Sequence, residues 1–491
     1  MISTVERWFS RSWLGPGFCG ITTLVLFFPV LGGGFLIWDD NVNLLSNPAL
    51  WQSEGAWRWM LTDLESVQRY KPINWLLWRW LGNSFGLNPV IFHVVNLVLH
   101  VGNAVLLFYV AQSFLCSRDK LRILPLWTIK LGAAVGSLVW ALHPLRVEPV
   151  AWISGVGYPL CTFFGLLAVL VFQHYLRGER ALWHRTAFVL FVVSLLCYPA
   201  AASLPALLLV LSLMAEDPHH TAKFSRLRAA LRHLAPYVLC SALLLGLTLL
   251  TRLNASGEIW HRPTTLADAG LLTRIGQAFA VWMWYLQKTL LPLNLSPVYV
   301  EFRDFSVISV RAAASLSMFI FLAVMAWRRH RMWPEAGPLS LAFLTLAIPV
   351  LGITDMPFTP SDRYTYVPSL ALALLLASGI ARVIHCFSSP AHQTATLVVT
   401  SLSIVALGFA STQQLAVWRS PITFFQHALA GVGSHPAAAD LHWRLGLHHL
   451  MADDPYAAIV EFRSVLRIDA KHEDAARYLR VLESRHPNMS E

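Results

Sequence analysis

The sequence predicts an all-α, polytopic membrane protein that ends in a short domain of helical repeats. The chain has 491 residues, of which 56% are hydrophobic and only 13% are charged, whereas a soluble domain carries about 25% charged residues. The apolar residues come in long runs up to about residue 415, and beyond it helical periodicity with mixed charge begins. We therefore expect a transmembrane domain over 1–415 and a helical repeat domain over 416–491.

The apolar runs define the expected membrane helices, each of which needs about 20 mostly apolar residues. The first run follows Arg7 and Arg11, is longer than the apolar part of a signal peptide, and lacks a clear cleavage site, so we interpret it as an uncleaved helix. About eleven or twelve spans are expected, because 186–215 is either two spans broken at Tyr198-Pro199 or one kinked span, and the proline favours a break. The runs are 16–37, 90–114, 127–142, 158–176, 186–198, 200–215, 234–251, 274–292, 309–327, 338–353, 366–385 and 395–415.

The net charge of +10 does not indicate nucleic-acid binding, because the basic residues form short clusters between apolar runs. This pattern follows the positive-inside rule. With the N-terminus in the cytoplasm, the loops 38–89, 143–157 and 354–365 are outside. The cluster Arg328–Arg331 lies inside only if one of the helices 274–292 and 309–327 does not cross the membrane. We expect 274–292 to be re-entrant or interfacial, because Gln287 and Lys288 lie among aromatic residues.

The first outer segment, 38–89, is rich in tryptophan, with Trp51, Trp57, Trp59, Trp75, Trp78 and Trp80. These residues predict amphipathic helices that lie flat on the membrane with their rings at headgroup depth. The alternative is a loop whose aromatic side chains pack on neighbouring helices.

The C-terminal segment follows the spacing of a tetratricopeptide repeat, whose period is about 34 residues, at Trp443, Leu445, Gly446, His449, Ala458, Phe462 and Val465. Asp453-Asp454-Pro455 marks the turn between the two helices. A helical hairpin of another kind is the alternative. Such repeats stack and offer a concave surface to partners.

Polar residues that are unusual in a membrane protein gather in four outward-facing segments. The adjacent acids Asp39 and Asp40 follow the first apolar run, and an ionisable pair at a membrane boundary is costly and usually functional. The other segments hold Tyr70 and Lys71 with His93, Asn96 and His100, then His143, Arg146 and Glu148, and finally Asp362, Arg363 and Tyr364.

These residue types suit a sugar donor linked to a polyprenyl phosphate, whose lipid tail lies in the membrane. Transfer to a hydroxyl needs a carboxylate to take the proton, and Asp39 or Asp40 fits this role. Cations must stabilise the departing phosphate, and arginine offers a bidentate fork. For donor binding we assign Arg363, Arg146, Lys71, His143 and Tyr364, and for shaping the pocket Glu148, His93, Asp362 and Tyr70.

Structural roles for the same residues stay open. The acidic pair could be a solvated loop or a cap, Arg146 could pair with Glu148, and Asp362 could pair with Arg363. His93, Asn96 and His100 share one helix face and fit hydrogen bonds between helices. No tight ligand spacing predicts a metal site, although the need for a divalent cation stays open.

In this order and ahead of the repeats, the motifs resemble the transmembrane-and-tetratricopeptide (TMTC-like) branch of the GT-C glycosyltransferases. They are Asp39-Asp40 with Asn47-Pro48, Tyr70-Lys71-Pro72, Phe92-His93 with Asn96 and His100, His143-Pro144 with Glu148–Trp152, and Asp362–Tyr364 with Tyr366–Ser369. The resemblance implies a GT-C membrane fold and an inverting sugar transfer from a polyprenyl-phosphate-linked donor. Asp39 or Asp40 would match the acidic pair of the family's first outer loop. The animal relatives are protein O-mannosyltransferases.

We therefore expect an enzyme that binds a polyprenyl-phosphate sugar, membrane lipid and a protein or glycan acceptor, the acceptor through its repeats. The short repeat array and the scattered cysteines suit a bacterial inner-membrane protein whose site and C-terminus face the periplasm. The alternative function is a non-catalytic membrane scaffold whose repeats assemble a cell-envelope complex. A transporter is less favoured, because the charged residues gather at one face instead of lining a path through the helices.

Overall fold

The computed structural model shows a helical bundle. It describes residues 6, 13–52, 54–62, 70–118, 121, 124–178, 180–215, 223–254, 270–302, 305–306, 309–353, 360–387 and 389–485. Within this part of the chain all regular secondary structure is helical. Arg7 and Arg11, from which the cytoplasmic position of the N-terminus is predicted, lie outside the described residues.

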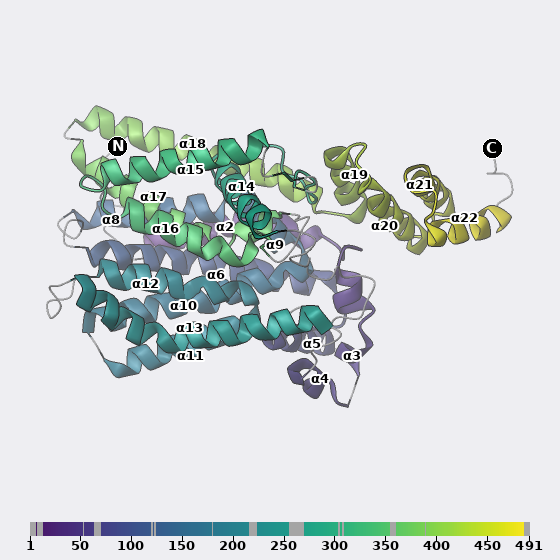
Figure 1. Cartoon of the computed structure of the whole chain (residues 1–491), viewed down its shortest axis with the longest axis horizontal. Helices are drawn as coiled ribbons and strands as arrows, with labels where there is room; N and C mark the ends of the chain where they lie inside the picture. The colour runs from purple at the N-terminus through teal and green to yellow at the C-terminus, as the bar shows by residue number, and fades with distance from the viewer. Residues whose placement is uncertain are drawn as a thin grey trace.

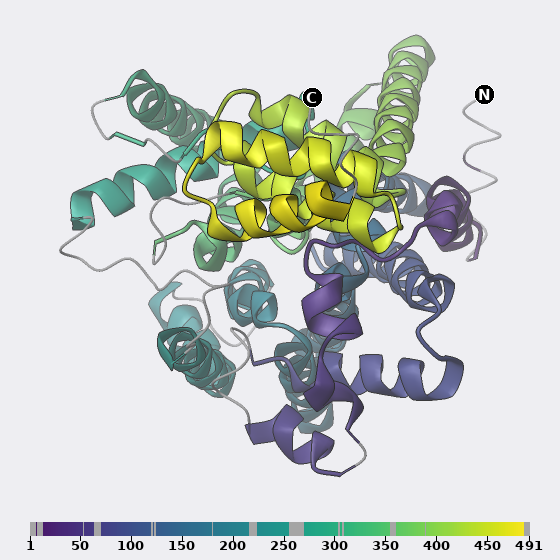
Figure 2. The same cartoon turned by 90° about the vertical axis from the view of Figure 1, so that its right-hand side faces the viewer.

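The bundle helices run along one axis, lengthwise in Figure 1 and mostly end-on in Figure 2. Most of their bounds lie within about six residues of the apolar runs, because a chain in a membrane must satisfy its backbone groups internally, but α2 ends ten residues before its run does and α13 begins eleven residues before its run. The helices are α2 (Leu14–Phe27), α6 (Pro89–Cys116), α8 (Leu126–Ala141), α10 (Gly157–Gly178), α11 (Ala181–Cys197), α12 (Leu204–Met214), α13 (Lys223–Asn254), α15 (Val310–Arg329), α16 (Ala336–Ala347), α17 (Ser369–Cys386) and α18 (Pro390–Val417). The predicted break at Tyr198-Pro199 is present, between α11 and the short helix that leads into α12.

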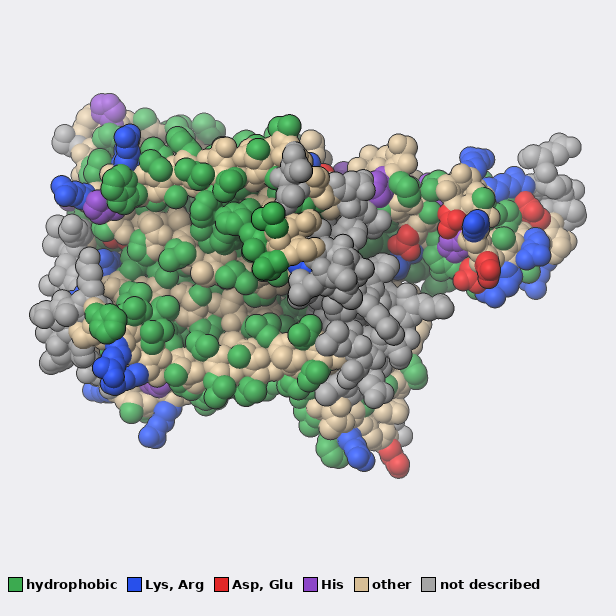
Figure 3. All heavy atoms as spheres, viewed as in Figure 1, with side chains coloured by type: hydrophobic (Ala, Val, Ile, Leu, Met, Phe, Trp, Pro, Cys, Tyr) green, Lys and Arg blue, Asp and Glu red, His purple; other side chains and the backbone are tan. Residues whose placement is uncertain are grey.

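Seven helices of the described chain are long and apolar enough to cross a membrane, or up to eight if a bent pair is counted as one span. Three shorter apolar helices cover 181–197, 199–214 and 336–350, so the predicted total requires these to cross as well. The flank of the bundle is mainly hydrophobic in Figure 3, whereas lysine and arginine side chains gather at its left end. The fold is that of a multi-pass membrane protein.

Two helices lie across the bundle axis. The helix α14 (Leu271–Leu290) is seen nearly end-on in Figure 1 and lengthwise in Figure 2, and it is not one of the seven candidate spans. The helix α5 (Pro72–Phe85) is also seen lengthwise in Figure 2. The crosswise course of α14 agrees with the expectation that 274–292 does not span.

The tryptophans of the first outer segment fall into two groups, one packed and one exposed. Besides α5 it contains α3 (Pro48–Trp51) and α4 (Ala56–Thr62). The rings of Trp59, Trp75 and Trp78 stack edge to face, with centroids 5.2 and 5.1 Å apart, whereas Trp57 and Trp80 are exposed. Trp75 and Trp78 therefore form part of a local core with Trp59, while a position of these helices flat on the membrane stays a prediction.

Buried ion pairs tie the helix ends together away from the acidic pair. The buried carboxylate of Glu335, at the start of α16, bonds Arg382 near the end of α17 at 2.7 Å and lies 3.8 Å from Arg118, which follows α6. Arg177 at the end of α10 donates to the Ser113 carbonyl of α6 at 2.6 Å. The loop after α6 and the segment after Arg328–Arg331 therefore lie at one end of the bundle, as the charge pattern predicts.

Small residues let α8 and α17 approach closely. A side-chain carbon added at Gly132 or Gly136 would lie only 2.5 Å from the carbonyl oxygen of Ala377 or Ala373. Such contacts are typical of packed membrane helices. The close packing brings the segment before α17, which holds Asp362 and Arg363, to the end of α8.

The C-terminal helices form the expected hairpins. They are α19 (Pro421–Val432), α20 (Ala438–Met451), α21 (Pro455–Ile468) and α22 (Glu473–Arg485), and they project from the end of the bundle that carries α3 and α9 (Figure 1). Asp454 accepts a hydrogen bond from the backbone N–H of Ala457 at 3.0 Å and begins α21. Gly446 lies against the Phe462 ring, which leaves no room for a side chain. These paired helices are consistent with a tetratricopeptide-like region.

Candidate functional site

The centre of the candidate site is a broken helix. After α8 the chain bends by 61° and continues as three short helical turns, Pro144–Arg146, α9 (Val147–Ala151) and Ile153–Val156. Nearly the whole stretch is buried and most of it is helical, so 143–157 is not an open loop, while its position on the outer side stays a prediction. Its prolines and polar residues resemble a loop in sequence, but neighbouring helices satisfy the backbone groups that the break leaves unpaired.

A polar stripe on α6 supplies these hydrogen bonds. The Asn96 side chain donates to the carbonyls of Val150 and Trp152, both at 3.1 Å. His100 bonds the Ala141 carbonyl at 3.0 Å through one ring nitrogen and the Tyr366 hydroxyl at 2.8 Å through the other. Asn96 and His100 therefore bond other helices, as one of the two interpretations expects. His93 lies against Gly33, whose added side-chain carbon would be 2.9 Å from the ring nitrogen Nε2.

Asp40 is a buried anchor between the first outer segment and the broken helix. Its Oδ1 accepts hydrogen bonds from the Ser154 backbone N–H at 2.9 Å and from the Ser154 hydroxyl at 2.5 Å. Its Oδ2 accepts from the Leu36 backbone N–H at 2.9 Å. Burial raises the pKa of Asp40 to about 7, and these hydrogen bonds oppose the rise. Both carboxylate oxygens are thus occupied by the protein.

Asp39 differs from its neighbour in exposure, because its side chain is half-buried while that of Asp40 is fully buried. The backbone carbonyl of Asp39 accepts from the Asn43 N–H at 2.8 Å, at the start of a short turn of helix over Asn41–Leu45. Of the two adjacent acids, Asp39 is therefore the more exposed one.

Replacing Asp40 by asparagine is expected to change how stability depends on pH. The folded pKa of about 7 lies above the usual 3.8, so the folded state holds the proton more tightly between these values. The free energy of unfolding then rises as the pH falls from 7 towards 4, and it declines as the pH rises. Thermal unfolding of both proteins in detergent, from about pH 8 to about pH 5, measures this contribution. Wild-type protein should gain Tm relative to Asp40→Asn on acidification, and parallel curves would contradict the assignment.

Glu148 forms an ion pair with Arg363. Its carboxylate accepts hydrogen bonds from the Arg363 guanidinium and, at 2.8 Å, from the Arg363 backbone N–H. The Ser361 hydroxyl donates to the same carboxylate at 2.7 Å. The Arg363 guanidinium also stacks on the rings of Trp152 and Tyr364, 5.1 and 4.9 Å from their centroids. Glu148 therefore pairs with Arg363 and not with Arg146, and the pair joins the broken helix to the segment before α17.

Asp362 points to a different partner. Its Oδ1 accepts a hydrogen bond of 2.7 Å from the Tyr299 hydroxyl. Burial first, and then the nearby Glu148 carboxylate, raise the pKa of Asp362. Burial and the Asp362 charge likewise raise the pKa of Tyr299. Asp362 therefore acts as a buried hydrogen-bonding group and not as the ion-pair partner of Arg363.

Arg146 lies at one end of a large apolar cavity. Its side chain is only 1% exposed and its guanidinium stacks on Trp140 and Tyr366, 5.6 and 5.4 Å from their centroids. One guanidinium nitrogen, Nη2, donates to the Thr365 hydroxyl at 2.9 Å. The other two nitrogens, Nε and Nη1, have no hydrogen-bond partner among the described residues. A buried cation with unused donors is costly unless a ligand completes it.

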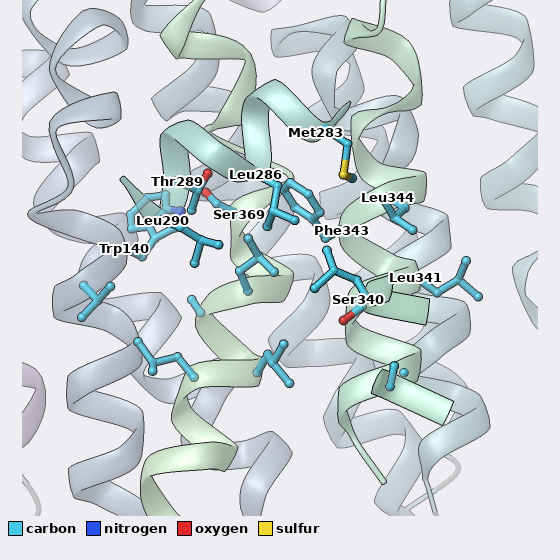
Figure 4. A pocket seen from close by; sticks show the side chains of 18 of the residues that line it. Trp140, Met283, Leu286, Thr289, Leu290, Ser340, Leu341, Phe343, Leu344 and Ser369 are labelled. Carbon is cyan, nitrogen blue, oxygen red and sulfur yellow. The ribbon is translucent and has the colours of Figure 1, made fainter. Parts of the chain in front are cut away.

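The cavity has a volume of about 590 Å³ and runs between α8, α14, α15, α16 and α17. Figure 4 shows Trp140, Thr289 and Ser369 at one end and Ser340 and Leu341 at the other. Apart from Arg146, His143 and a few hydroxyl groups, the lining side chains are almost all apolar. His143 bonds the Thr289 carbonyl at 3.0 Å, which fixes the head of the cavity against α14. The shape suits an apolar chain with an anionic head.

The other predicted site residues lie around this centre to different degrees. Lys71 is buried over the Trp75 and Trp78 rings, 4.4 and 4.6 Å from their centroids. The Tyr70 hydroxyl donates to the Leu61 carbonyl at 3.1 Å. These contacts belong to the first outer segment, so the proposed donor role of Lys71 stays a prediction. Within the part of the chain described, no three His, Cys, Asp or Glu side chains form a group that could hold a metal ion.

Sequence reasoning missed Tyr299, Thr289 and Trp418. Tyr299 bonds Asp362, the Thr289 carbonyl bonds His143, and the Trp418 ring lies 6.5 Å from that of Trp152. Each lies outside the four polar segments and is an ordinary residue in its own surroundings. Thr289 acts through its backbone carbonyl, so its residue type carries no signal of this contact.

Comparison with known proteins gives distant relatives along most of the chain. Human protein O-mannosyl-transferase TMTC4 is 24% identical over 492 residues, which cover 87% of this chain and 62% of that protein. The Caenorhabditis elegans protein O-mannosyl-transferase F38B6.6 is 22% identical, over 86% of this chain and 58% of its own length. Human protein O-mannosyl-transferase TMTC3 is 20% identical, over 80% and 45%.

The chain thus spans between 45% and 62% of the length of these three relatives. No family model and no solved structure matches it. The similarity nevertheless covers 80% to 87% of this chain. Over most of its length, this chain is a distant homologue of the TMTC protein O-mannosyl-transferases.

Proposed function

We propose that this protein is a GT-C-type glycosyltransferase that moves a mannosyl group from a polyprenyl-phosphate-linked donor to a hydroxyl group of a protein. The observation that carries the proposal is the unfilled guanidinium of Arg146 at the head of an apolar cavity. A phosphate has the charge and the acceptor oxygens to complete this arginine. The cavity behind it fits part of a polyprenyl chain. The names of the distant relatives support mannose and a protein acceptor.

The proposed reaction is a single displacement. Asp39 accepts the proton of the acceptor hydroxyl, and the hydroxyl oxygen forms a bond to the anomeric carbon of the sugar. The bond between that carbon and the phosphate oxygen breaks, and the electron pair leaves with the polyprenyl phosphate. Arg146 stabilises the charge that grows on the departing phosphate. One displacement inverts the configuration at the anomeric carbon.

The remaining residues hold this arrangement in place. Asp40 fixes the first outer segment to Ser154 of the broken helix. The Glu148–Arg363 pair fixes the broken helix to the segment before α17. Arg363 then carries donor phosphate only if the incoming anion competes with Glu148, so Arg146 is the better phosphate ligand. Lys71, His143 and Tyr364 stay proposed contacts of the donor, and Tyr70 and His93 stay proposed parts of the pocket wall.

We propose further that this end of the bundle faces away from the cytoplasm. The opposite end carries Arg118, Arg177 and the cluster Arg328–Arg331, and basic residues are retained on the cytoplasmic side. In a bacterium this places the site and the repeat domain in the periplasm. Labelling of a single cysteine introduced at an exposed position of α20 or α21, in intact cells and in lysed cells, tests the orientation.

The direct test is transfer by the purified full chain in nanodiscs. Polyprenyl-phosphate mannose carrying a radioactive sugar is the donor, and peptides rich in serine and threonine are acceptors. Label should move to the peptide and polyprenyl phosphate should be released in equal amount. If no donor binds, yet deletion of 420–491 abolishes a complex with other envelope proteins, the chain is a non-catalytic scaffold, and the glycosyltransferase proposal is wrong.

A further inference from the structure

Arg444 of the repeat domain reaches back to the residue that precedes the acidic pair. Its Nη1 donates a hydrogen bond of 3.1 Å to the backbone carbonyl of Trp38, and its guanidinium carbon lies 5.0 Å above the Trp38 ring. Its Nε donates to Asp440 one helical turn earlier, at 2.9 Å. Asp440 therefore orients the guanidinium through Nε, while Nη1 of the same guanidinium bonds Trp38.

The Trp38 ring belongs to an aromatic cluster that we define as Trp38, Phe424, Trp418 and Trp152. Their centroids are separated in turn by 5.6, 5.0 and 6.5 Å. The cluster is built from the first outer segment, the entry to the repeat domain and the broken helix. Its last ring, Trp152, is also the ring on which Arg363 stacks. One continuous packing unit thus touches both the acidic pair and the Glu148–Arg363 pair.

The repeat domain is held against the bundle at a second place. His427 of α19 bonds the Leu295 carbonyl at 2.9 Å. An added side-chain carbon at Gly431 would lie 2.7 Å from the Ser296 hydroxyl, so the helix and this loop are in close contact. The next residues of the loop lead to Tyr299, the partner of Asp362. Two separate contacts fix the position of α19 and α20 relative to the site.

The backbone of Asp39 is consequently fixed from both sides. Arg444 holds the carbonyl of Trp38, immediately before it, and the Asn43 N–H bonds the carbonyl of Asp39 itself. The Asp39 side chain is half-buried, and a shift of this backbone would move its carboxylate as well.

We propose that Arg444 is a positioning residue that aims the Asp39 carboxylate, so that the repeat domain completes the acceptor side of the site. The expected fall in kcat rests on the proposed function, whereas the ordering of the backbone around Asp39 does not. A base displaced by about 1 Å can cost up to about a hundredfold in rate. The domain expected to bind acceptors thus also supports the group that activates them.

The kinetic test compares Arg444→Ala with Arg463→Ala as the matched control. Arg463 has a similar exposure, 29% against 26%, but it pairs with Glu483 inside the repeat domain. In Arg444→Ala we expect kcat to fall about tenfold with the donor KM unchanged. Arg444→Lys should recover part of kcat, because a lysine keeps a cation above Trp38 but loses the planar fork. Arg463→Ala should keep wild-type kcat.

Hydrogen exchange of the same full-length proteins tests the positioning without any catalysis. In Arg444→Ala the amides of residues 36–46 should exchange at least about tenfold faster, because they lose a fixed neighbour, while those of 89–116 keep their rates. Unchanged exchange over 36–46 would overturn the inference even if transfer occurs. If exchange is faster in Arg444→Ala but the wild-type protein transfers no sugar, the positioning role is upheld and the proposed function is rejected. An equal loss of kcat in Arg444→Ala and in Arg463→Ala would also overturn the inference.

Discussion

Asp39→Asn is expected to reduce the rate of sugar transfer by about 10² to 10⁴-fold, the contribution typical of a general base. Asparagine has nearly the same size, so it fits the half-buried position, but its amide cannot take the proton of the acceptor hydroxyl. The donor KM should stay near its wild-type value, because the carboxylate acts on the acceptor. Single-turnover transfer from polyprenyl-phosphate mannose measures the chemical step directly.

The matched control for this experiment is Asp474→Asn on α22. Asp474 is a surface aspartate, 54% exposed, whose contact is with Arg477 one turn away. This variant should transfer at the wild-type rate. Asp39→Asn should also retain the wild-type Tm, since a substitution at a partly exposed site without a core role changes stability little. Full activity of Asp39→Asn would remove this residue from the chemistry and contradict its role as the base.

The two acids show which part of the site sequence reasoning reaches. The pair Asp39-Asp40 stands out in the sequence because two carboxylates follow an apolar run. Nothing in the sequence separates their roles, because the separation depends on Ser154, more than one hundred residues later. Asp40 is fully buried and bonded to Leu36 and Ser154, whereas Asp39 is the more exposed of the two acids.

The helices were more predictable than their breaks. The run 90–114 became α6, Pro89–Cys116, because the length of an apolar run limits where a helix can begin and end. The segment 143–157 after α8 was predicted to be an outer loop, because it lies between two apolar runs. It stays buried, with Asn96 of α6 bonded to two of its carbonyls and His100 bonded to the last carbonyl of α8. Such compensation joins residues far apart in sequence, and local pattern does not report it.

The partner of Glu148 illustrates the same limit. Arg146 is near in sequence and was a natural candidate, but Arg363 forms the ion pair. Removing one partner of a buried pair leaves an uncompensated charge, which costs about 3 to 5 kcal/mol. Pairing Glu148 with Arg363 leaves Arg146 with two unfilled donors. The choice of partner thus creates the site at which a phosphate can bind.

Arg146→Gln is expected to lower kcat/KM for the donor by about 10² to 10³-fold, the range found when one stabilising donor of a transition state is removed. Glutamine keeps a hydrogen-bond donor for Thr365 but carries no charge for the phosphate. Arg146→Lys should recover part of the activity, because it restores the charge without the bidentate fork. Binding of polyprenyl phosphate, which carries no sugar, should be weaker in Arg146→Lys than in wild type and weakest in Arg146→Gln. Because binding involves no proton transfer, this measurement separates loss of the phosphate site from loss of the base.

The cavity allows the head and the tail of the donor to be tested separately. Ser340 lines the cavity at the end away from Thr289 (Figure 4), so Ser340→Phe should fill the far end and leave the head intact. This variant should raise the KM for a long-chain polyprenyl donor and spare a donor with a short chain. Arg146→Gln should impair both donors equally, because both carry the same phosphate. If Arg146→Gln spares either donor, the arginine does not hold the phosphate, and the apolar cavity belongs to a lipid of the membrane instead.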